Sequence, residues 1–144
     1  MKKLLAIIAL SGALFFTAQN TAQAQTEGYE LGVRNFYGVS FAMPLGNNRL
    51  HASAAVNFNQ NFGIDALYNW QIPIIDDNWF LFPGVGVATE FNANGVFAGV
   101  AAEFGIEYQF DFPLSLSVDV RPTFYFTDIA PFNPNGAIEA RWRF

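Results

Sequence analysis

One histidine and one serine stand at a spacing that could support nucleophilic chemistry. His51 and Ser53 are two residues apart, so in a strand both side chains project to the same side. A serine hydroxyl beside an imidazole can act as a nucleophile with its base, provided that a third group orients the base. No acidic residue is obviously placed to orient His51. We therefore expect His51 to lie in a polar interior, and we predict no catalytic residue and no enzymatic activity.

Metal and cofactor chemistry find no support in the sequence either. With one His and no Cys, the usual zinc ligand sets cannot be assembled. Asp76 and Asp77 are adjacent in a turn-rich stretch, where we expect solvated carboxylates. No glycine-rich phosphate motif precedes a helix, because no segment has a convincing helical period. We expect no cofactor and no bound metal.

The composition divides the chain into a targeting segment and one domain. Lys2 and Lys3 precede an apolar run from Leu4 to Phe16, and Ala22-Gln23-Ala24 forms a small-residue cleavage site. This pattern predicts a cleaved secretory signal peptide over residues 1–24 and a domain over residues 25–144, with a buried N-terminal helix as the alternative. The domain then has five arginines, twelve carboxylates and no lysine. Such a balance is unusual for a soluble surface and disfavours a nucleic-acid partner.

Alternating apolar and polar residues predict an all-β domain of eight strands. Each segment is bounded by Gly, Asn, Asp or Pro turn residues. The expected strands are Tyr29–Arg34, Tyr37–Met43, Arg49–Phe58, Phe62–Ile72, Trp79–Phe91, Val96–Phe110, Leu114–Phe126 and Asn135–Phe144. An even number of antiparallel strands can close into an up-and-down transmembrane β-barrel, with the last strand pairing to the first. Turns 44–48, 73–78 and 111–113 would then be periplasmic, and connections 35–36, 59–61, 92–95 and 128–134 would face outward.

Three features indicate that the charged face looks into the barrel and the apolar face outward. The charged face is rich in Gly, Ala and Ser, as expected where an eight-stranded barrel has room only for packed side chains. Its cations are arginines, which pair carboxylates in confined sites better than lysine does. Aromatic residues gather near the expected periplasmic rim, as in a membrane girdle. These residues are Tyr29, Trp70, Trp79, Tyr108, Trp142 and Phe144.

The inward charges are expected to form an ionic network that fills the lumen. Its predicted members are Glu30, Arg34, Asp65, Glu103, Glu107, Asp119, Arg121, Glu139, Arg141 and Arg143, with Glu90 and His51 on the same face. Counting from the 111–113 turn places Glu103 near Arg121, and Asp119 near Arg141 or Arg143. Arg143 can meet Glu30 only if the barrel closes. An unpaired charge there would cost several kcal/mol, so we expect a plug and no open channel. Loosely hydrated charges in a wet lumen are the alternative.

Several stretches carry a resemblance to a known family. They are Gly-Val-Arg at 32–34, Asn-Arg-Leu-His-Ala at 48–52, Pro-Gly-Val-Gly at 83–86, Gly-Ile-Glu-Tyr at 105–108, and the segment 113–124. Together with the pattern over residues 25–144, they resemble the small outer-membrane barrels of the OmpA/OmpX type, in a Bacteroidetes-like form. The resemblance implies a monomer in the outer membrane of a Gram-negative bacterium, with lipids as its surroundings. It also implies periplasmic chaperones and the barrel-assembly machinery as partners, the latter reading Trp142 and Phe144 as an assembly signal.

We expect a structural or unassigned role in the cell envelope, and two rivals stay open. His51-Ala52-Ser53 resembles the His-x-Ser pair of outer-membrane lipid A deacylases, which would make the protein a lipid-modifying barrel enzyme. A secreted soluble barrel that binds an apolar ligand is the other rival. The short expected outward loops disfavour adhesion.

Overall fold

The computed structural model describes residues 28–57, 60–128 and 131–144. The predicted signal peptide lies outside these residues. Within them the regular secondary structure is entirely β, and no helix is long and apolar enough to cross a membrane. The strands are β1 (Glu30–Arg34), β2 (Gly38–Leu45), β3 (Asn48–Val56), β4 (Phe62–Asn69), β5 (Ile72–Pro73), β6 (Trp79–Leu81), β7 (Gly84–Asn92), β8 (Gly95–Gln109), β9 (Leu114–Tyr125) and β10 (Phe132–Arg143).

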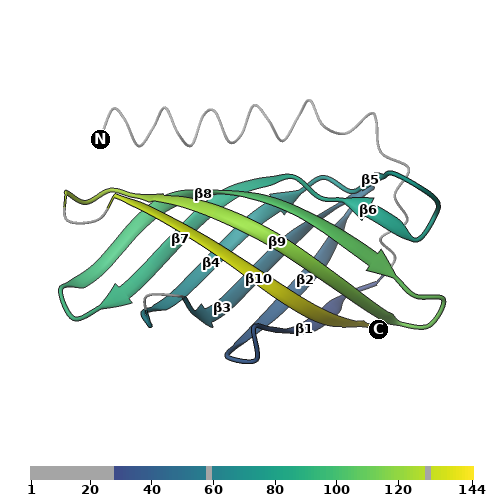
Figure 1. The fold of residues 1–144 in the computed structure, drawn as a ribbon, viewed down its shortest axis with the longest axis horizontal. Coiled ribbons are helices and arrows are strands. Elements are labelled where there is room, and N and C mark those ends of the chain that lie inside the picture. Colours follow the sequence, from purple (N-terminus) through teal and green to yellow (C-terminus); the bar gives the residue numbers. More distant parts are fainter. Residues whose placement is uncertain (1–27, 58–59, 129–130) are drawn as a thin grey trace.

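These strands form one closed antiparallel barrel (Figure 1). β4 and β5 are two parts of one strand of the wall, and so are β6 and β7, which Phe82 and Pro83 separate. Across this break the amide of Trp70 donates to the carbonyl of Pro83 at 2.9 Å. Counted in this way the wall has eight strands. The first and last strands pair from Glu30 opposite Arg143 to Arg34 opposite Glu139, which closes the barrel as predicted.

The charged face of the sheet lies inside the barrel and the apolar face outside. Glu103 and Arg121 are 1% and 2% exposed. Val118 and Trp142, on the other face, are 53% and 48% exposed. Because strand side chains alternate, this arrangement extends around the whole wall. The predicted inward direction of the charges is therefore confirmed.

Strand boundaries differ from the prediction most clearly at the β2–β3 turn and at the start of β10. β2 and β3 are joined by a tight turn at Gly46, which has a φ of +64°, so the strands reach further into 44–48 than expected. β10 begins at Phe132, whereas the sequence predicted a loop up to Pro134. Asn133 extends the strand because its side chain points inward and donates to Glu90 at 3.1 Å. The 128–134 loop is thus shorter than predicted.

Pro122 interrupts the ladder between β8 and β9. Pairing runs from Gly99 to Ala101 and resumes at Phe104, and the gap faces Arg121 and Pro122. Proline has no amide hydrogen to donate, so a ladder bond is lost at this point. The interruption lies in the second half of β9.

The two ends of the barrel differ in outline (Figure 1). The turn end carries the C-terminus, the β5–β6 hairpin and the β8–β9 turn. At the opposite end, called the loop end, the β7–β8 and β9–β10 connections reach furthest. The β1–β2 turn stops well short of them. The loop end is therefore stepped, with its lowest point over β1 and β2.

Candidate functional site: a buried ionic network

Side chains from six of the strands meet inside the barrel and form an ionic network. Its members are Glu30, Arg34, Arg49, His51, Asp65, Glu103, Glu107, Asp119, Arg121, Glu139, Arg141 and Arg143. Period-two alternation turns each of these residues inward, and the barrel wall brings the strands to face one another. The network therefore results from closure of the barrel and not from any local motif.

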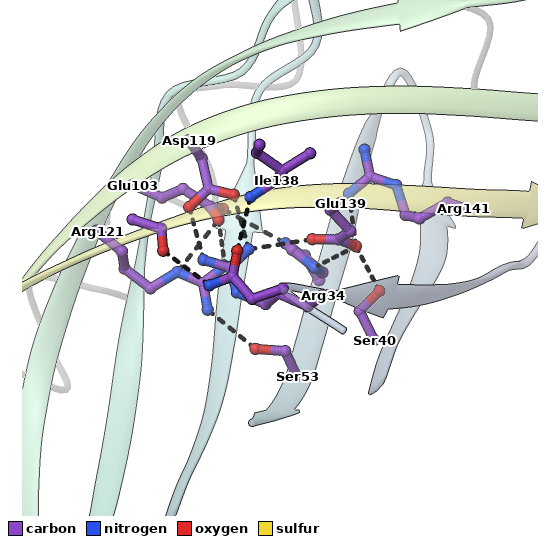
Figure 2. Close-up of polar contacts among 12 residues, drawn as sticks. Arg34, Ser40, Ser53, Glu103, Asp119, Arg121, Ile138, Glu139 and Arg141 are labelled. Carbon is purple, nitrogen blue, oxygen red and sulfur yellow. Dashed lines mark hydrogen bonds and ion pairs between the residues drawn. The ribbon is translucent and has the colours of Figure 1, made fainter. Parts of the chain in front are cut away.

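Arg34 holds two carboxylates from neighbouring strands (Figure 2). Its guanidinium binds Asp119 through two parallel contacts of 2.7 and 2.6 Å. A third contact of 3.1 Å joins it to Glu139. The paired contacts have the fork geometry that favours arginine over lysine at a carboxylate.

Arg121 is the second centre of the network. Its Nη1 lies 2.5 Å from Asp65 Oδ2, and its Nη2 binds Glu103. Nη1 also donates to Ser53 Oγ at 3.0 Å, and that hydroxyl donates to Asp65 Oδ1 at 2.7 Å. The guanidinium is 3% exposed, so its charge is balanced almost entirely by protein carboxylates.

Arg49 and Arg141 form a third centre toward the turn end. Both guanidinium groups lie over the Phe82 ring, at 5.0 and 5.9 Å from its centroid. Arg49 binds Glu107 at 2.7 Å, and Arg141 binds Glu30 at 3.1 Å. Like charges meet here only because the aromatic face and shared carboxylates offset their repulsion.

His51 connects the Arg121 centre to the centres of Arg34 and Arg141, because it lies between Glu103 and Glu139. Its Nδ1 lies 3.4 Å from Glu103 Oε2 and its Nε2 lies 3.3 Å from Glu139 Oε1. Ionised carboxylates can only accept, so both ring nitrogens serve as N–H donors only in the imidazolium. With His51 charged, six cationic side chains face the six carboxylates of the network, and the charges of the network balance.

A second polar cluster, separate from the network, lies at the loop end around Glu90. Four asparagine amides donate to its carboxylate at 2.7 to 3.1 Å, from Asn57, Asn61, Asn92 and Asn133. The Asn57 and Asn92 carbonyls accept backbone amides, so these side chains are fixed as donors toward Glu90. The cluster ties β7, β10 and the β3–β4 loop together.

The structure brings some predicted partners together and separates others. Glu103 meets Arg121, and Arg143 meets Glu30 at 3.2 Å, as counting along the strands suggested. The expected pairing of Asp119 with Arg141 or Arg143 is wrong. Because β10 begins earlier, Asp119 lies opposite Ala137, and the carboxylate reaches Arg34 on β1 instead.

Sequence reasoning missed Arg49, which is fully buried in the network. It has the same strand parity as His51, so alternation alone could have placed it inside. Phe80 and Phe82 share the inward strand parity of Glu90, and they fill the lumen at 4% and 0% exposure. Alternation therefore carries the direction of these two rings, although not their packing against charged groups.

His51 and Ser53 do not form a nucleophile and base. Both nitrogens of His51 face carboxylates, and the Ser53 hydroxyl is held by Asp65 and Arg121. No hydrogen bond joins the two residues. Ser53 therefore lacks the neighbouring base that acyl-transfer chemistry requires.

The remaining predicted sites are surface features. Asp76 and Asp77 are exposed in the β5–β6 turn, and Asp76 accepts the amides of Asn78 and Trp79. Among the described residues, no group of three or more His, Cys, Asp or Glu could hold a metal ion. Trp142 and Phe144 lie exposed at the turn end, and the Phe144 amide donates to Tyr29 at 2.9 Å.

Comparison with known proteins gives no family. No protein-family model, curated protein or solved structure matches the chain. What the chain does must therefore be inferred from its own geometry.

Substitution of His51 tests whether its charge supports the network. His51→Leu leaves Glu103 and Glu139 short of a cation, and we expect the free energy of unfolding to fall by about 2–4 kcal/mol. His51→Gln keeps a hydrogen-bond donor without the charge and is expected to cost about half as much. Urea unfolding in detergent micelles measures both variants. Equal losses would show that the charge of His51 contributes nothing.

Proposed function

We propose that the protein is an integral outer-membrane β-barrel with a structural role in the cell envelope and no enzymatic activity. The observation that carries this proposal is the inverted polarity of the barrel. Charged side chains fill the inside, and large apolar side chains cover the outside. Such a wall requires hydrocarbon around it, as in transmembrane barrels.

The outer face is too apolar for a barrel dissolved in water. Val118 lies opposite both Ile106 and Ile138 on the neighbouring strands, and these side chains are 37–64% exposed. The same pattern continues on β1, β2 and β4, so the exposed apolar surface is continuous. Soluble monomers rarely expose contiguous apolar patches of more than a few hundred Å². A secreted soluble barrel is therefore disfavoured.

Aromatic rings at the turn end support a membrane interface there. Trp79 packs on Tyr108 at 4.9 Å between ring centroids, and Tyr68 packs on Trp70 at 5.3 Å. Tyr29 stacks on Phe41 at 5.9 Å. Girdles of aromatic residues mark the lipid–water boundary of such barrels. In this proposal the turn end faces the periplasm, and Trp142 and Phe144 serve as the assembly signal.

The resemblance to OmpA/OmpX-type barrels points in the same direction. It suggests export by a signal peptide over residues 1–24 to the outer membrane of a Gram-negative cell. Chaperones and the barrel-assembly machinery would then be transient partners, and the folded protein a monomer. The network gives the lumen no continuous aqueous path, so the role is structural and not that of a porin.

A lipid-modifying enzyme is the weaker candidate. Its only support is His51-Ala52-Ser53, and the His51 and Ser53 side chains point into the network, each bound to other partners. Mass spectrometry of lipid A from cells with and without the protein would reveal such an activity as a mass shift. We expect identical spectra.

One gel experiment tests the membrane placement. The full chain is expressed in a Gram-negative host, the outer membrane is extracted with detergent, and samples are run on a denaturing gel with and without boiling. A lipid-embedded barrel stays folded in the unboiled lane and migrates faster. Recovery in the soluble periplasmic fraction, with one migration in both lanes, would overturn the proposal.

A further inference from the structure

The wall of the barrel has a side opening above the β1–β2 turn. β10 continues beyond its last pairing with β1, through Phe132–Gly136. In the part of the chain that the structure describes, this stretch pairs only with β9. On the other side of the turn, β3 is paired with β2 up to Ala55, opposite Gly38, and ends at Val56. Above the turn the wall therefore lacks β1 and β2, and β10 forms the free edge of the opening.

The β10 edge of this opening does not suit strand addition. Ile138 exchanges hydrogen bonds with Asn35, so the alternate residues Gly136 and Pro134 also direct their backbone toward the gap. The Gly136 carbonyl is taken by Asn35 Nδ2 at 3.0 Å. Pro134 has no amide hydrogen, and a proline at an edge blocks pairing with another chain. An extended peptide is therefore a poor occupant.

A small polar recess lies behind the opening. It has a volume of about 40 Å³ and is lined in part by Arg34, Ser53, Asp65, Arg121, Thr123 and Asn135. That is room for a few water-sized groups. The Asn135 Oδ1 atom is buried and has no hydrogen-bond donor among the described residues. The recess thus presents an unused acceptor.

The β1–β2 turn, which forms the lower edge of the opening, is aromatic and held rigidly. Asn35 and Phe36 have φ values of 50° and 63°, a conformation that costs a bulky residue about 1–2 kcal/mol. Three hydrogen bonds from Asn35 to β10 hold this turn in place. Phe36 and Tyr37 are 90% and 78% exposed. Strain held in this way keeps two aromatic side chains outside the wall, directly below the opening.

We propose that this opening admits an amphiphile from the surrounding lipid, whose uncharged, hydroxyl-bearing head enters the recess while its hydrocarbon lies along Phe36 and Tyr37. The inference rests on the proposed membrane placement, which brings lipid into contact with Phe36 and Tyr37. The hydroxyl donates to Asn135 Oδ1, the acceptor that lacks a donor.

The head is uncharged because the charges around the recess are already matched. Arg34 is paired with Asp119, and Arg121 with Asp65 and Glu103. A phosphate or ammonium group would add an unpaired charge to a confined space, which is unfavourable. A monoacylglycerol has the required chemistry: neutral hydroxyls on a single hydrocarbon chain.

Gly63 provides a variant that closes the recess. It lines the recess, and a Cβ built on it would meet only Thr89 O at 3.6 Å and Ala55 O at 3.8 Å, ordinary contact distances. Gly63→Leu should therefore fill the recess without moving the backbone. Ala66→Leu is the matched control, because it adds the same side chain to the lipid-facing side of the same strand.

The experiment uses the protein in phosphatidylcholine nanodiscs and records backbone amide shifts by NMR. Monooleoylglycerol is titrated, with methyl oleate as the probe that lacks the hydroxyls. We expect saturable shifts at Asn35, Thr123 and Gly136 with monooleoylglycerol in the native chain and in Ala66→Leu. In Gly63→Leu, whose remaining spectrum reports its fold, binding should be weaker by about tenfold or more.

Three outcomes would overturn the inference: no saturable shifts, equal shifts with methyl oleate, or unchanged binding in Gly63→Leu. If the membrane placement itself is wrong, the protein will not incorporate into nanodiscs, and this result differs from a failure of the binding site. Incorporation without binding rejects the side opening as a site and leaves the proposed function intact.

Discussion

Replacing Arg121 with leucine is expected to lower the free energy of unfolding by about 3–5 kcal/mol. Arg121 is the cation for both Asp65 and Glu103, and its side chain is 3% exposed. Leucine has a similar apolar stem but leaves Asp65 without its cation and Glu103 with His51 alone, in a confined interior. The penalty for such uncompensated charges exceeds what any single surface change produces.

The measurement is urea unfolding of the refolded barrel in detergent micelles, followed by circular dichroism. Arg143→Leu is the matched control. The Arg143 side chain is 25% exposed, and its ion-pair partner among the described residues is Glu30, which also has Arg49 and Arg141 as partners. We expect this control to lose about 1 kcal/mol or less. Similar losses in the two variants would mean that burial of the network adds nothing to stability.

A double variant separates charge from packing at the same place. Arg121→Leu combined with Asp65→Asn removes the cation together with one anion, so five cations face five carboxylates and Glu103 keeps His51. If unpaired charge causes the loss, the double variant should regain much of the stability of the native chain, because coupled residues are non-additive. A double variant less stable than Arg121→Leu alone would point to lost packing instead.

Placing an arginine at Val118 is expected to cost about 2–4 kcal/mol when the barrel is folded in lipid vesicles. Val118 is 53% exposed on the outer face, in the middle of β9 and between apolar partners on β8 and β10. In a membrane this position faces hydrocarbon, where a guanidinium loses its hydration. In water the same change would be neutral and would improve solubility.

The control for this variant is Asp77→Arg, in the exposed turn of the β5–β6 hairpin. It also introduces an arginine, but beyond the barrel wall, and we expect a change within about 0.5 kcal/mol. Unfolding by urea in vesicles gives both values. If Val118→Arg unfolds like the native chain, the outer face does not contact lipid and the proposed function fails.

Alternation of side chains made most of this fold predictable. Leu114 to Phe126 alternates so cleanly that its inward and outward residues could be assigned without a structure. The presence of Gly and Ser beside Arg and Glu then indicated which face looks inward, because only a narrow lumen needs small neighbours.

Register and strand length could not be predicted in the same way. Asp119 meets Arg34 because β10 begins at Phe132, and that start depends on Asn133 reaching Glu90 across the barrel. The short β1–β2 turn likewise depends on Asn35 bonding to β10. Such contacts join residues far apart in sequence, so local patterns carry no trace of them. Local sequence patterns likewise do not indicate that the Phe82 ring packs against two arginines.

The ion pairs across the closing seam also bear on how the barrel assembles. Arg34 binds Glu139, and Arg143 binds Glu30, so the first and last strands share charges as well as backbone bonds. If the barrel is placed in a membrane as proposed, a half-inserted sheet with this seam apart would hold bare carboxylates and guanidinium groups in hydrocarbon. On that proposal, insertion and closure should occur in one concerted event, and unfolding should proceed without a populated open-sheet intermediate.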